Sequence, residues 1–303
     1  DISFSLEDFK FNDSCPDLSQ YNAIVFIGNS NSKISARWRK SCDLKGVSSL
    51  WLTGVNSSFN SKSISLNRLD NSKDEVLLNL ERGFSFKSHE GLDMSMGLNQ
   101  ISAQDVINNL SELDLKLIIK ILGEEKEASR IAKNIVKSRS IKKITKVQEL
   151  VQIIEKSKKK NYSSKINPCT KTFQALRIFV NKEITELISG IINATKILKP
   201  GGKILIVSFH SIEDKIVKYF FSNFSTNKSK PSRYLPEQND SNTALFEEYK
   251  NKVLKPTKKE IDQNNRSRSA KLRYAIRSKN KFSYPSDLEK KFKKYLDLEA
   301  INA

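Results

Sequence analysis

The sequence predicts an α/β protein whose strand-forming segments are separated by an all-helical module. Two apolar runs of good β-formers, at 23–27 and 203–208, are typical of buried strands. Between them, residues 101–157 repeat apolar side chains at three- and four-residue steps, the spacing of amphipathic helices. A further run, 270–277, alternates apolar and basic residues and predicts a half-exposed strand.

The first 80 residues carry the weakest pattern. Besides the strand at 23–27, residues 49–53 predict a second strand. Ser and Asn fill 18 of the 44 positions from 29 to 72, and this composition is typical of loops. Regular structure is therefore expected mainly after residue 80.

Three helix starts are predicted in the middle of the chain by capping-box spacing. In this motif a Ser or Thr side chain and a polar side chain three residues later bond each other's backbone N–H groups. The three pairs are Ser102 with Asp105, Ser111 with Asp114, and Thr145 with Gln148.

One long helix is predicted next, because apolar residues recur at helical steps from Phe173 to Ala194 and Lys199-Pro-Gly-Gly202 ends the pattern. The run 203–208 that follows predicts a central parallel strand. A polar stripe on the helix is formed by Gln174, Arg177 and Asn181. The stripe is either exposed surface or, if buried, needs partners, and an arginine prefers phosphate or carboxylate.

A polar cluster follows this strand directly, at Ser208 to Asp214. Ligands of open α/β sheets bind beyond the carboxyl ends of the strands, so the position suits a site. Ser211 and Asp214 have capping-box spacing, and Glu213 adds favourable charge at the helix start, so helix initiation alone explains both carboxylates. Phe209 and His210 cap nothing in this scheme and could clamp and stack a base.

A metal site is the alternative for the same cluster. His210, Glu213 and Asp214 are possible ligands, and a metal there would predict a Mg²⁺-dependent nuclease. The sequence offers no second cluster of ligands to complete such a site. No metal is therefore expected.

The charge balance points to a polyanionic partner. The 303 residues contain 53 Lys and Arg against 34 Asp and Glu, a net charge of +19. Such a surplus favours nucleic acid or an acidic membrane surface, although part of it matches the Lys-, Asn- and Ile-rich composition typical of AT-rich genomes. The basic run 265–273 is suited to phosphate-backbone contacts, or is an exposed basic surface without a ligand.

Membrane and disulfide classes are not indicated. No run approaches the roughly 18 apolar residues that a membrane span needs, and the first residues lack a signal pattern, so a cytoplasmic protein is expected. Cys15, Cys42 and Cys169 are far apart and form no C-x-x-C pair. They are expected to be reduced thiols.

Seven short motifs occur in a fixed order from residue 81 to about residue 278. They are Glu81–Phe86, Gly91–Met94, Gly123–Glu125, Thr172–Ile178 followed by Val180, Asn181 and Glu183, Pro200–Gly202, Ser208–Asp214, and Arg266–Arg273. In this order they resemble the bacterial 16S rRNA cytosine-N4 methyltransferase family, also called RsmH or MraW. The order makes the resemblance specific, since each motif alone is weak.

The resemblance implies a class I, Rossmann-like S-adenosylmethionine-dependent methyltransferase with an inserted all-helical substrate-recognition module. The methyltransferase domain would comprise 1–98, in atypical form, and 168–303, with the insert at 99–167. S-adenosylmethionine would be the methyl donor, and a cytosine in the 16S rRNA of the small ribosomal subunit would be the acceptor.

Site residues follow from the motifs. The catalytic candidates are Ser208, Phe209, His210 and Asn181. The candidates for binding the substrate RNA are Arg82, Phe84, Phe86, Asp93, Met94, Gln174, Arg177, Glu213, Asp214, Arg266, Arg268, Lys271 and Arg273. No residue is assigned to the donor.

The first 80 residues depart from the family pattern. Family members open with a glycine-rich loop, then an acidic residue for the donor's ribose, then an Asp-Leu-Gly-Val-Ser-Ser loop shortly before the Arg-Gly-Phe-Ser-Phe motif. The glycines before Gly83 are only Gly28, Gly46 and Gly54, too far apart for that loop. The letters of 43–49 are similar to the acidic loop, but Lys45 is inserted and the segment lies too far before residue 82.

Two explanations are compatible with this departure. Either the N-terminal part comes from a shifted frame or a fusion and the chain is a catalytically impaired RNA-binding relative, or it is a divergent half that still builds the sheet. The strand-like run Val76–Leu80 could then feed a lost loop. A smaller departure is Ser95, where the family has an arginine.

Overall fold

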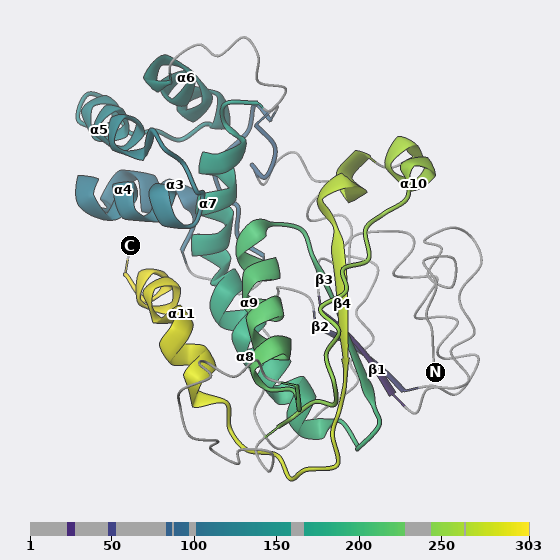
Figure 1. Cartoon of the computed structure of the whole chain (residues 1–303). Helices are drawn as coiled ribbons and strands as arrows, with labels where there is room; N and C mark the ends of the chain where they lie inside the picture. The colour runs from purple at the N-terminus through teal and green to yellow at the C-terminus, as the bar shows by residue number, and fades with distance from the viewer. Residues whose placement is uncertain are drawn as a thin grey trace. The chain divides into compact units, whose positions relative to one another are not determined.

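The computed structural model describes residues 23–27, 48–52, 83–86, 88–96, 101–158, 167–227, 244–263 and 265–302 (Figure 1). For 23–27 and 48–52 it describes the backbone only. The chain forms two compact units. Unit 1 comprises Asp1–Thr53 and Leu187–Phe292, and unit 2 comprises Gly54–Glu186 and Lys293–Ala303.

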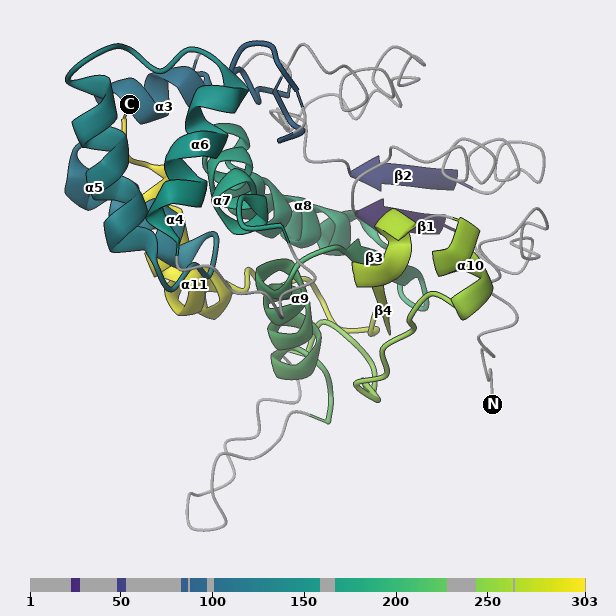
Figure 2. The ribbon, with the colours of Figure 1, turned by 90° about the horizontal axis from the view of Figure 1, so that it is seen from above.

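Unit 1 contains a four-stranded sheet in the order β2-β1-β3-β4 (Figure 2). Its strands are β1 (Ala23–Ile27), β2 (Ser48–Leu52), β3 (Lys203–Ser208) and β4 (Lys271–Ile276). β1 is parallel to both β2 and β3, whereas β4 is antiparallel to β3. The strands predicted at 23–27, 49–53, 203–208 and 270–277 are confirmed, and the α/β class with them.

Helix α9 (Ser211–Asn223) packs on β3 and β4. Its Phe220 and Phe221 are fully buried, and each ring meets Phe246 edge to face at 5.2 Å between ring centroids. Such aromatic pairs add about 0.5–1.5 kcal/mol each to the energy of burial. The remaining short elements of this unit are α10 (Lys258–Gln263) and the 3-10 helix η3 (Asn265–Ser269).

Unit 2 is mostly helical. Its helices are α3 (Ala103–Asn109), α4 (Glu112–Ile121), α5 (Ala128–Arg139), α6 (Val147–Ser157) and α7 (Thr170–Asn181). Helix α4 packs against both α5 and α7, and α5 also packs against α6. The helical spacing found in the sequence therefore marks true core faces, since Leu115, Ile118 and Ile119 have no exposed surface.

Two of the three predicted helix starts are confirmed, the first with a complete capping box and the second with the Ser111 side-chain bond alone. The Ser102 hydroxyl accepts the N–H of Asp105 at 3.1 Å, and the Asp105 carboxylate accepts the N–H of Ser102 at 2.9 Å. The Ser111 hydroxyl accepts the N–H of Asp114 at 3.1 Å and donates to its carboxylate at 2.6 Å.

The third predicted pair, Thr145 with Gln148, is wrong. The carboxylate of Glu149 accepts the N–H groups of Thr145 at 2.9 Å and of Lys146 at 3.1 Å. A charged acceptor binds free backbone N–H groups more strongly than a neutral amide, which is why the neighbouring residue takes the cap. The Gln148 amide instead donates to the carbonyl of Ser88 at 2.7 Å.

The single long helix predicted from Phe173 is also wrong. It is broken at Lys182, whose φ is 49°, into α7 and α8 (Glu183–Ile197). A break exposes N–H groups at the start of the second helix. Here the carboxylate of Glu299 accepts the N–H groups of Ile184 at 2.9 Å and of Thr185 at 2.8 Å.

Glu299 lies at the end of α11 (Ser286–Glu299) and is 2% exposed. It also accepts the Thr185 hydroxyl at 2.7 Å, so three donors surround one buried carboxylate. This cap, far away in the sequence, is the physical reason that a stripe of continuous helical spacing folds as two helices.

The segment that carries the Gly83-Phe-Ser-Phe86 letters docks on the start of α6. Gly83 has a φ of +72°, and a Cβ at this position would lie against the carbonyl oxygen of Gly91. Only glycine fits there. The Val147 N–H donates to the Glu90 carbonyl at 3.0 Å and fixes the far side of the segment.

No helix in the described ranges is both long and apolar enough to cross a membrane. Of the three cysteines, Cys169 is described; it is buried, and burial raises the pKa of its thiol to about 12. Cys169 is therefore a protonated core residue, as expected of a plain reduced thiol. Cys15 and Cys42 lie outside the described residues.

Candidate functional site

The predicted site residues take part in three polar clusters, which are described unit by unit. In unit 2, the Asn181 cluster consists of the Asn181 side chain and backbone groups of Met94, Met96 and Arg177. In unit 1, the His210 cap consists of Phe209, His210 and Glu213, and the Asp214 cluster consists of Asp214, Tyr249, Asn251, Lys271 and Arg273.

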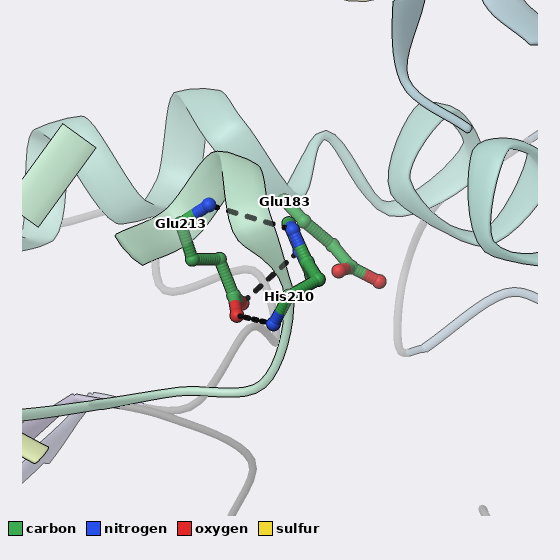
Figure 3. Close-up of side chains that lie close together, drawn as sticks. All are labelled: Glu183, His210 and Glu213. Carbon is green, nitrogen blue, oxygen red and sulfur yellow. Dashed lines mark hydrogen bonds and ion pairs between the residues drawn. The ribbon is translucent and has the colours of Figure 1, made fainter. Parts of the chain in front are cut away.

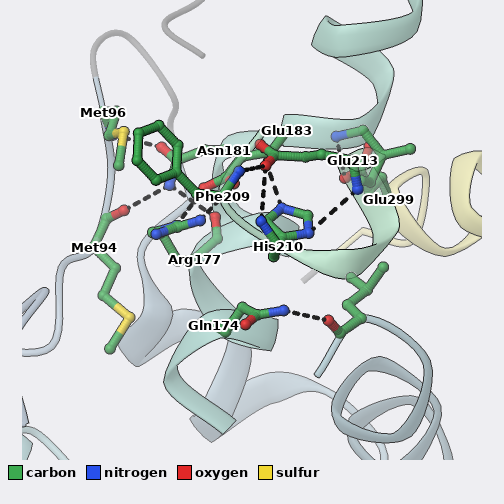
Figure 4. A network of polar contacts seen from close by, with 12 residues as sticks. Met94, Met96, Gln174, Arg177, Asn181, Glu183, Phe209, His210, Glu213 and Glu299 are labelled. Carbon is green, nitrogen blue, oxygen red and sulfur yellow. Dashed lines mark hydrogen bonds and ion pairs between the residues drawn. The ribbon is translucent and has the colours of Figure 1, made fainter. Parts of the chain in front are cut away.

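Asn181, the last residue of α7, is 1% exposed and uses its whole amide inside the protein. Its Nδ2 donates to the carbonyls of Met94 and Arg177, both at 2.8 Å, and its Oδ1 accepts the N–H of Met96 at 2.6 Å (Figure 4). The two acceptors and the one donor around it leave one orientation of the amide.

This amide holds an unusual backbone conformation. Met94 is buried and has a φ of 55°, a left-handed value that costs a non-glycine residue about 1–2 kcal/mol. The bonds from Asn181 to the Met94 carbonyl and the Met96 N–H, which flank Ser95, stabilise this conformation. Asn181 therefore positions residues 94–96, and its amide groups are already occupied by these contacts.

Next to this cluster, Asp93 and Ser95 bond to each other. The Ser95 hydroxyl donates to Asp93 Oδ1 at 2.6 Å, and Ser95 is 6% exposed. The Asp93 carbonyl accepts the N–H of Ala103 at 2.7 Å, at the start of α3. The serine that replaces the family's arginine is thus an interior residue in this chain.

The polar stripe of α7 finds partners within unit 2. Arg177 forms a two-point ion pair with Glu183, with Nε–Oε1 at 2.7 Å and Nη2–Oε2 at 3.0 Å. Gln174 Nε2 donates to the carbonyl of Leu122 at 3.3 Å (Figure 4). The stripe is therefore partnered, and Arg177 takes a carboxylate, as its chemistry favours.

Of the two aromatic residues in the docked segment, Phe84 is half-buried and Phe86 packs on the core. The Phe86 ring meets Phe173 edge to face, with 6.2 Å between ring centroids. Arg82, which was expected to bind RNA with them, lies outside the described residues.

In unit 1, His210 is the cap of α9, so the predicted Ser211–Asp214 box is wrong by one residue. The N–H of Glu213 donates to His210 Nδ1 at 3.4 Å, and the N–H of His210 donates to Glu213 Oε2 at 3.2 Å (Figure 3). The same carboxylate oxygen accepts the N–H of Phe209 at 2.7 Å. Glu213 thus satisfies two backbone donors that a Ser–Asp box one residue later would leave open.

The cap also sets the state of the imidazole. Because Nδ1 accepts a hydrogen bond, the proton of the neutral ring lies on Nε2, which is 3.4 Å from Glu213 Oε1. The side chain is 6% exposed. The ring of Phe209 is half-buried, and the hydroxyl of Ser208 donates to the Lys271 carbonyl at 3.3 Å.

Asp214 turns away from the cap and binds β4. Its Oδ1 accepts Arg273 Nε at 2.7 Å, and its Oδ2 accepts Lys271 Nζ at 2.9 Å and Arg273 Nη2 at 3.3 Å. Arg273 Nη1 also donates to the Tyr249 hydroxyl at 2.9 Å and to Asn251 Oδ1 at 3.0 Å. These bonds fasten α9 to the sheet edge.

Burial would raise the pKa of Asp214, but hydrogen bonds from Arg273 and Lys271 outweigh it and hold the pKa below its ordinary value. Asp214 is therefore an anion at neutral pH. Its oxygens are committed to two cations, which argues against the alternative metal site of His210, Glu213 and Asp214. The same pairing withdraws Arg273, which is 4% exposed, from direct contact with RNA phosphates.

Other members of the basic run are placed differently. Arg268 is exposed and Lys271 is half-exposed, so both remain accessible to a ligand. The side chain of Arg266 lies outside the described part of the structure.

Three residues of these networks were missed by the sequence analysis: Tyr249, Asn251 and Glu299. Tyr249 and Asn251 lie in a segment without helical or strand periodicity, so no sequence signal marks them. Asn251 has a φ of 51°, a left-handed backbone conformation that asparagine adopts more readily than most residues.

Comparison with known proteins covers the part of the chain that contains all three clusters. The model of the MraW methylase family matches residues 74–278. Proteins called ribosomal RNA small subunit methyltransferase H are similar over 198 residues, which is 65% of this chain: those of Bartonella grahamii at 45%, Agrobacterium fabrum at 43% and Parvibaculum lavamentivorans at 42% identity. The matched region spans 59%, 58% and 58% of these relatives, respectively, less than two thirds of their length.

The family match begins at residue 74 and therefore excludes the Ser- and Asn-rich N-terminal part, in agreement with the resemblance found from residue 81 onward. It ends at residue 278, just after β4, so Glu299 lies beyond it. Because the match covers more than half of the sequence, the chain belongs to the MraW methylase family.

Proposed function

We propose that this protein transfers a methyl group from S-adenosylmethionine to the N4 amino group of a cytosine in the 16S rRNA of the small ribosomal subunit. The observation that carries the proposal is the family match over residues 74–278, which contains the Asn181 cluster, the His210 cap and the Asp214 cluster. Membership of this family implies an S-adenosylmethionine-dependent methyltransferase fold. The names of the similar relatives supply the rRNA substrate.

The acceptor chemistry sets what the protein residues must do. The lone pair of a cytosine amino group is delocalised into the ring, so the base must be held firmly and its N–H protons must meet acceptors. We assign the stacking contact to the half-buried ring of Phe209 and the positioning of the Ser208–Phe209 turn to the His210 cap. Within unit 2, Asn181 positions residues 94–96.

S-adenosylmethionine would supply an activated methyl group. The described residues offer no candidate cradle for it, and the sequence that follows β1 has a single glycine, Gly28, before Gly46. This does not fit the glycine-rich loop that the resemblance implies. We therefore assign no residue to the donor and derive no step through it.

The helical segment is assigned to the substrate. We infer that residues 99–167 form a substrate-recognition insert between the two parts of the methyltransferase domain, 1–98 and 168–303. The exposed Arg268 and half-exposed Lys271 are assigned to the RNA backbone. We infer that the reaction takes place in the cytoplasm, because the proposed substrate is rRNA.

The direct test is methyl transfer to a transcript of the small-subunit rRNA. The purified protein is incubated with transcript and S-adenosylmethionine, and nuclease fragments are analysed by mass spectrometry. The expected result is one cytidine fragment heavier by one methyl group. A Phe209→Leu variant, which keeps apolar volume but removes the stacking face, should raise the KM for the transcript about 10-fold. No methylated fragment with the wild-type protein would reject the proposal.

A second candidate function is favoured by the missing glycine-rich loop: a catalytically impaired relative that binds the rRNA without modifying it. Isothermal titration of the protein with S-adenosylmethionine separates the two functions. An impaired relative binds the transcript with an affinity that falls as salt rises but shows no heat of binding with the donor. An enzyme shows both.

A further inference from the structure

A basic groove lies within unit 2, between α5 and α6 and the loop that joins them. Its volume is about 430 Å³, and its lining contains four lysines and one glutamate, a net charge of +3. Lys137 comes from α5, Lys142 and Lys143 from the connecting loop, and Lys156 from α6. The groove therefore collects positive charge from three consecutive pieces of chain.

Most of this charge is available to a ligand. Lys142 pairs with Glu149 at 3.1 Å, and Glu149 is further occupied by capping α6. Lys137, Lys143 and Lys156 are exposed, and among the described residues none of them has a carboxylate within ion-pair distance. Three unpaired ammonium groups around one concavity repel each other, which is a cost that an anion would remove.

The groove also has a fixed floor. Ile144, at its base, is 2% exposed, and its N–H and carbonyl are both bonded to the side chain of Asn108. The loop that carries Lys142 and Lys143 is therefore held at its far end by α3. Lysines on a held loop lose less freedom on binding than lysines on a mobile one.

We propose that this groove, which shares no lining residue with the Asn181 cluster, the His210 cap or the Asp214 cluster, binds the sugar-phosphate backbone of RNA. The lining has lysines and no arginine. Ammonium groups act as point charges without the fork geometry that fixes a carboxylate or a guanine edge. The groove thus supplies affinity and register to any RNA strand that lies in it, without reading its sequence. This inference rests on the proposed function for the identity of the polyanion.

The test compares two triple variants of the full chain. The groove variant carries Lys137→Gln, Lys143→Gln and Lys156→Gln. The control variant carries Lys120→Gln, Lys126→Gln and Lys133→Gln, three exposed lysines of the same helical segment that do not line the groove. Both variants lose three positive charges. A difference between them in RNA affinity therefore depends on where the lysines lie and not on the net charge. Thermal unfolding of both variants verifies that they fold.

Binding of the small-subunit rRNA transcript and of an unrelated RNA of equal length is measured from 50 to 200 mM salt. If all three lysines contact phosphates, the log–log salt slope should fall in magnitude by about 2, and the affinity at 0.1 M salt by on the order of 100-fold. The loss should be equal for the two RNAs, while the control variant keeps the wild-type slope. Equal slopes for the groove variant and the wild type, or an equal loss in the control variant, would overturn the proposal.

Failure of this inference and failure of the proposed function give different results. If the wild-type protein methylates the transcript and the groove variant keeps its salt slope, only the groove assignment is lost. If the wild-type protein binds RNA through the groove but yields no methylated cytidine, the groove stands and the enzyme assignment fails. If the groove variant keeps the RNA affinity of the wild type but loses binding to poly-glutamate, the groove binds an acidic protein and not RNA.

Discussion

The Asn181 cluster and the Asp214 cluster do the same structural task with opposite chemistry. Each fastens a segment to a helix through one nearly buried side chain, a loop at Met94 in one case and strand β4 in the other. Asn181 does so with a neutral amide that makes three bonds. Asp214 does so with a carboxylate held by a guanidinium and an ammonium group.

The difference teaches how each cluster responds to change. A neutral amide leaves backbone groups unsatisfied when it is removed, and its bonds do not depend on pH. A buried ion pair leaves an unneutralised charge when one partner is removed, which costs more, and it weakens when the acid is protonated. Asn181 and Asp214 both stand in family motifs, and both hold two segments of the chain together. The two clusters differ in the kind of bond that does so, a neutral amide in one and an ion pair in the other.

The largest effect is expected from breaking the Asp214 cluster on one side. Arg273→Met should lower the free energy of unfolding by about 3–5 kcal/mol, because the Asp214 side chain is 13% exposed and would keep only Lys271 as a counter-charge. Urea denaturation measures this loss. Adding Asp214→Leu to the same variant should restore most of it, since the unpaired carboxylate is gone. A larger loss in the double variant would contradict this account.

The pair Lys293–Asp297, whose side chains are 70% and 58% exposed, is the matched control for an ion pair in water. Asp297→Asn should change the free energy of unfolding by no more than about 0.5 kcal/mol. Acid sharpens the same contrast. In the folded protein the pKa of the Asp214 carboxyl is held below its ordinary value of 3.8. The stabilisation that Asp214 provides is therefore complete when the pH is above the pKa of the unfolded state, and it is lost as the pH falls through the pKa of the folded state.

The next largest effect on the free energy of unfolding is expected at Glu299, which caps the start of α8 just after Asn181. Burial raises its pKa from 4.5 to about 7, against hydrogen bonds from Thr185 and Ile184 that lower it, with the charge of Glu183 adding to the rise. A raised pKa means that the folded state holds a proton that the unfolded state has released. This contribution to stability is full below pH 4.5 and is lost as the pH rises through about 7.

The difference in unfolding free energy between the wild type and Glu299→Gln should therefore shrink by about 3 kcal/mol between pH 4.5 and 8. Chemical denaturation at four or five pH values measures it. Glutamine keeps the size of the side chain and cannot titrate, so pH effects of other groups cancel in the difference. A difference that stays constant with pH would show that Glu299 does not titrate in this range.

Removing the Asn181 amide should have a smaller effect on stability. Asn181→Ala leaves the Met94 carbonyl and the Met96 N–H without their partner, at about 1 kcal/mol or more each, for a total of about 2 kcal/mol. The loss should be the same at pH 5 and pH 8, unlike that of Glu299→Gln, whose carboxylate titrates between these values. A pH-dependent loss would show that charged groups contribute to this cluster.

Apart from the exposed control pair Lys293–Asp297, the smallest effect is expected at the His210 cap. His210→Asn keeps a side-chain acceptor for the Glu213 N–H, whereas His210→Ala removes it and should cost about 1 kcal/mol in the free energy of unfolding. Thermal unfolding of the two variants gives the difference. If the imidazole also orients the Phe209 turn, His210→Ala should raise the KM for rRNA, and His210→Asn should restore it. Equal KM values for the two variants and the wild type would show that His210 caps α9 but does not orient Phe209 for RNA binding.

The sequence contained the local signals but not the distant partners. The Ser102–Asp105 cap, the core faces and the four strands depend on residues within a few positions of each other, and all formed as predicted. The cap of α9 was placed one residue late, because Ser–Asp and His–Glu spacings overlap there and only backbone geometry decides which N–H groups are open. Asp214 was recognised, but its partners on β4 lie 57 and 59 residues away.

The break after α7 could not be predicted for the same reason. Its apolar spacing is continuous, and the carboxylate that caps the second helix comes from residue 299. One signal was present: Leu288, Phe292, Tyr295 and Glu299 follow each other at four- and three-residue steps, which places a lone acid on the buried face of α11. A charge on a buried helical face needs donors, and α8 supplies them.

The cap of α8 has a consequence for the order in which the chain is made. Ile184 and Glu299 are separated by 115 residues, so the start of α8 leaves the ribosome well before the group that completes it. At common rates of translation the interval is about 6 to 23 s. During that time the N–H groups of Ile184 and Thr185 have only water as a partner. The cap at the start of α8 can therefore form only after α11 has been synthesised.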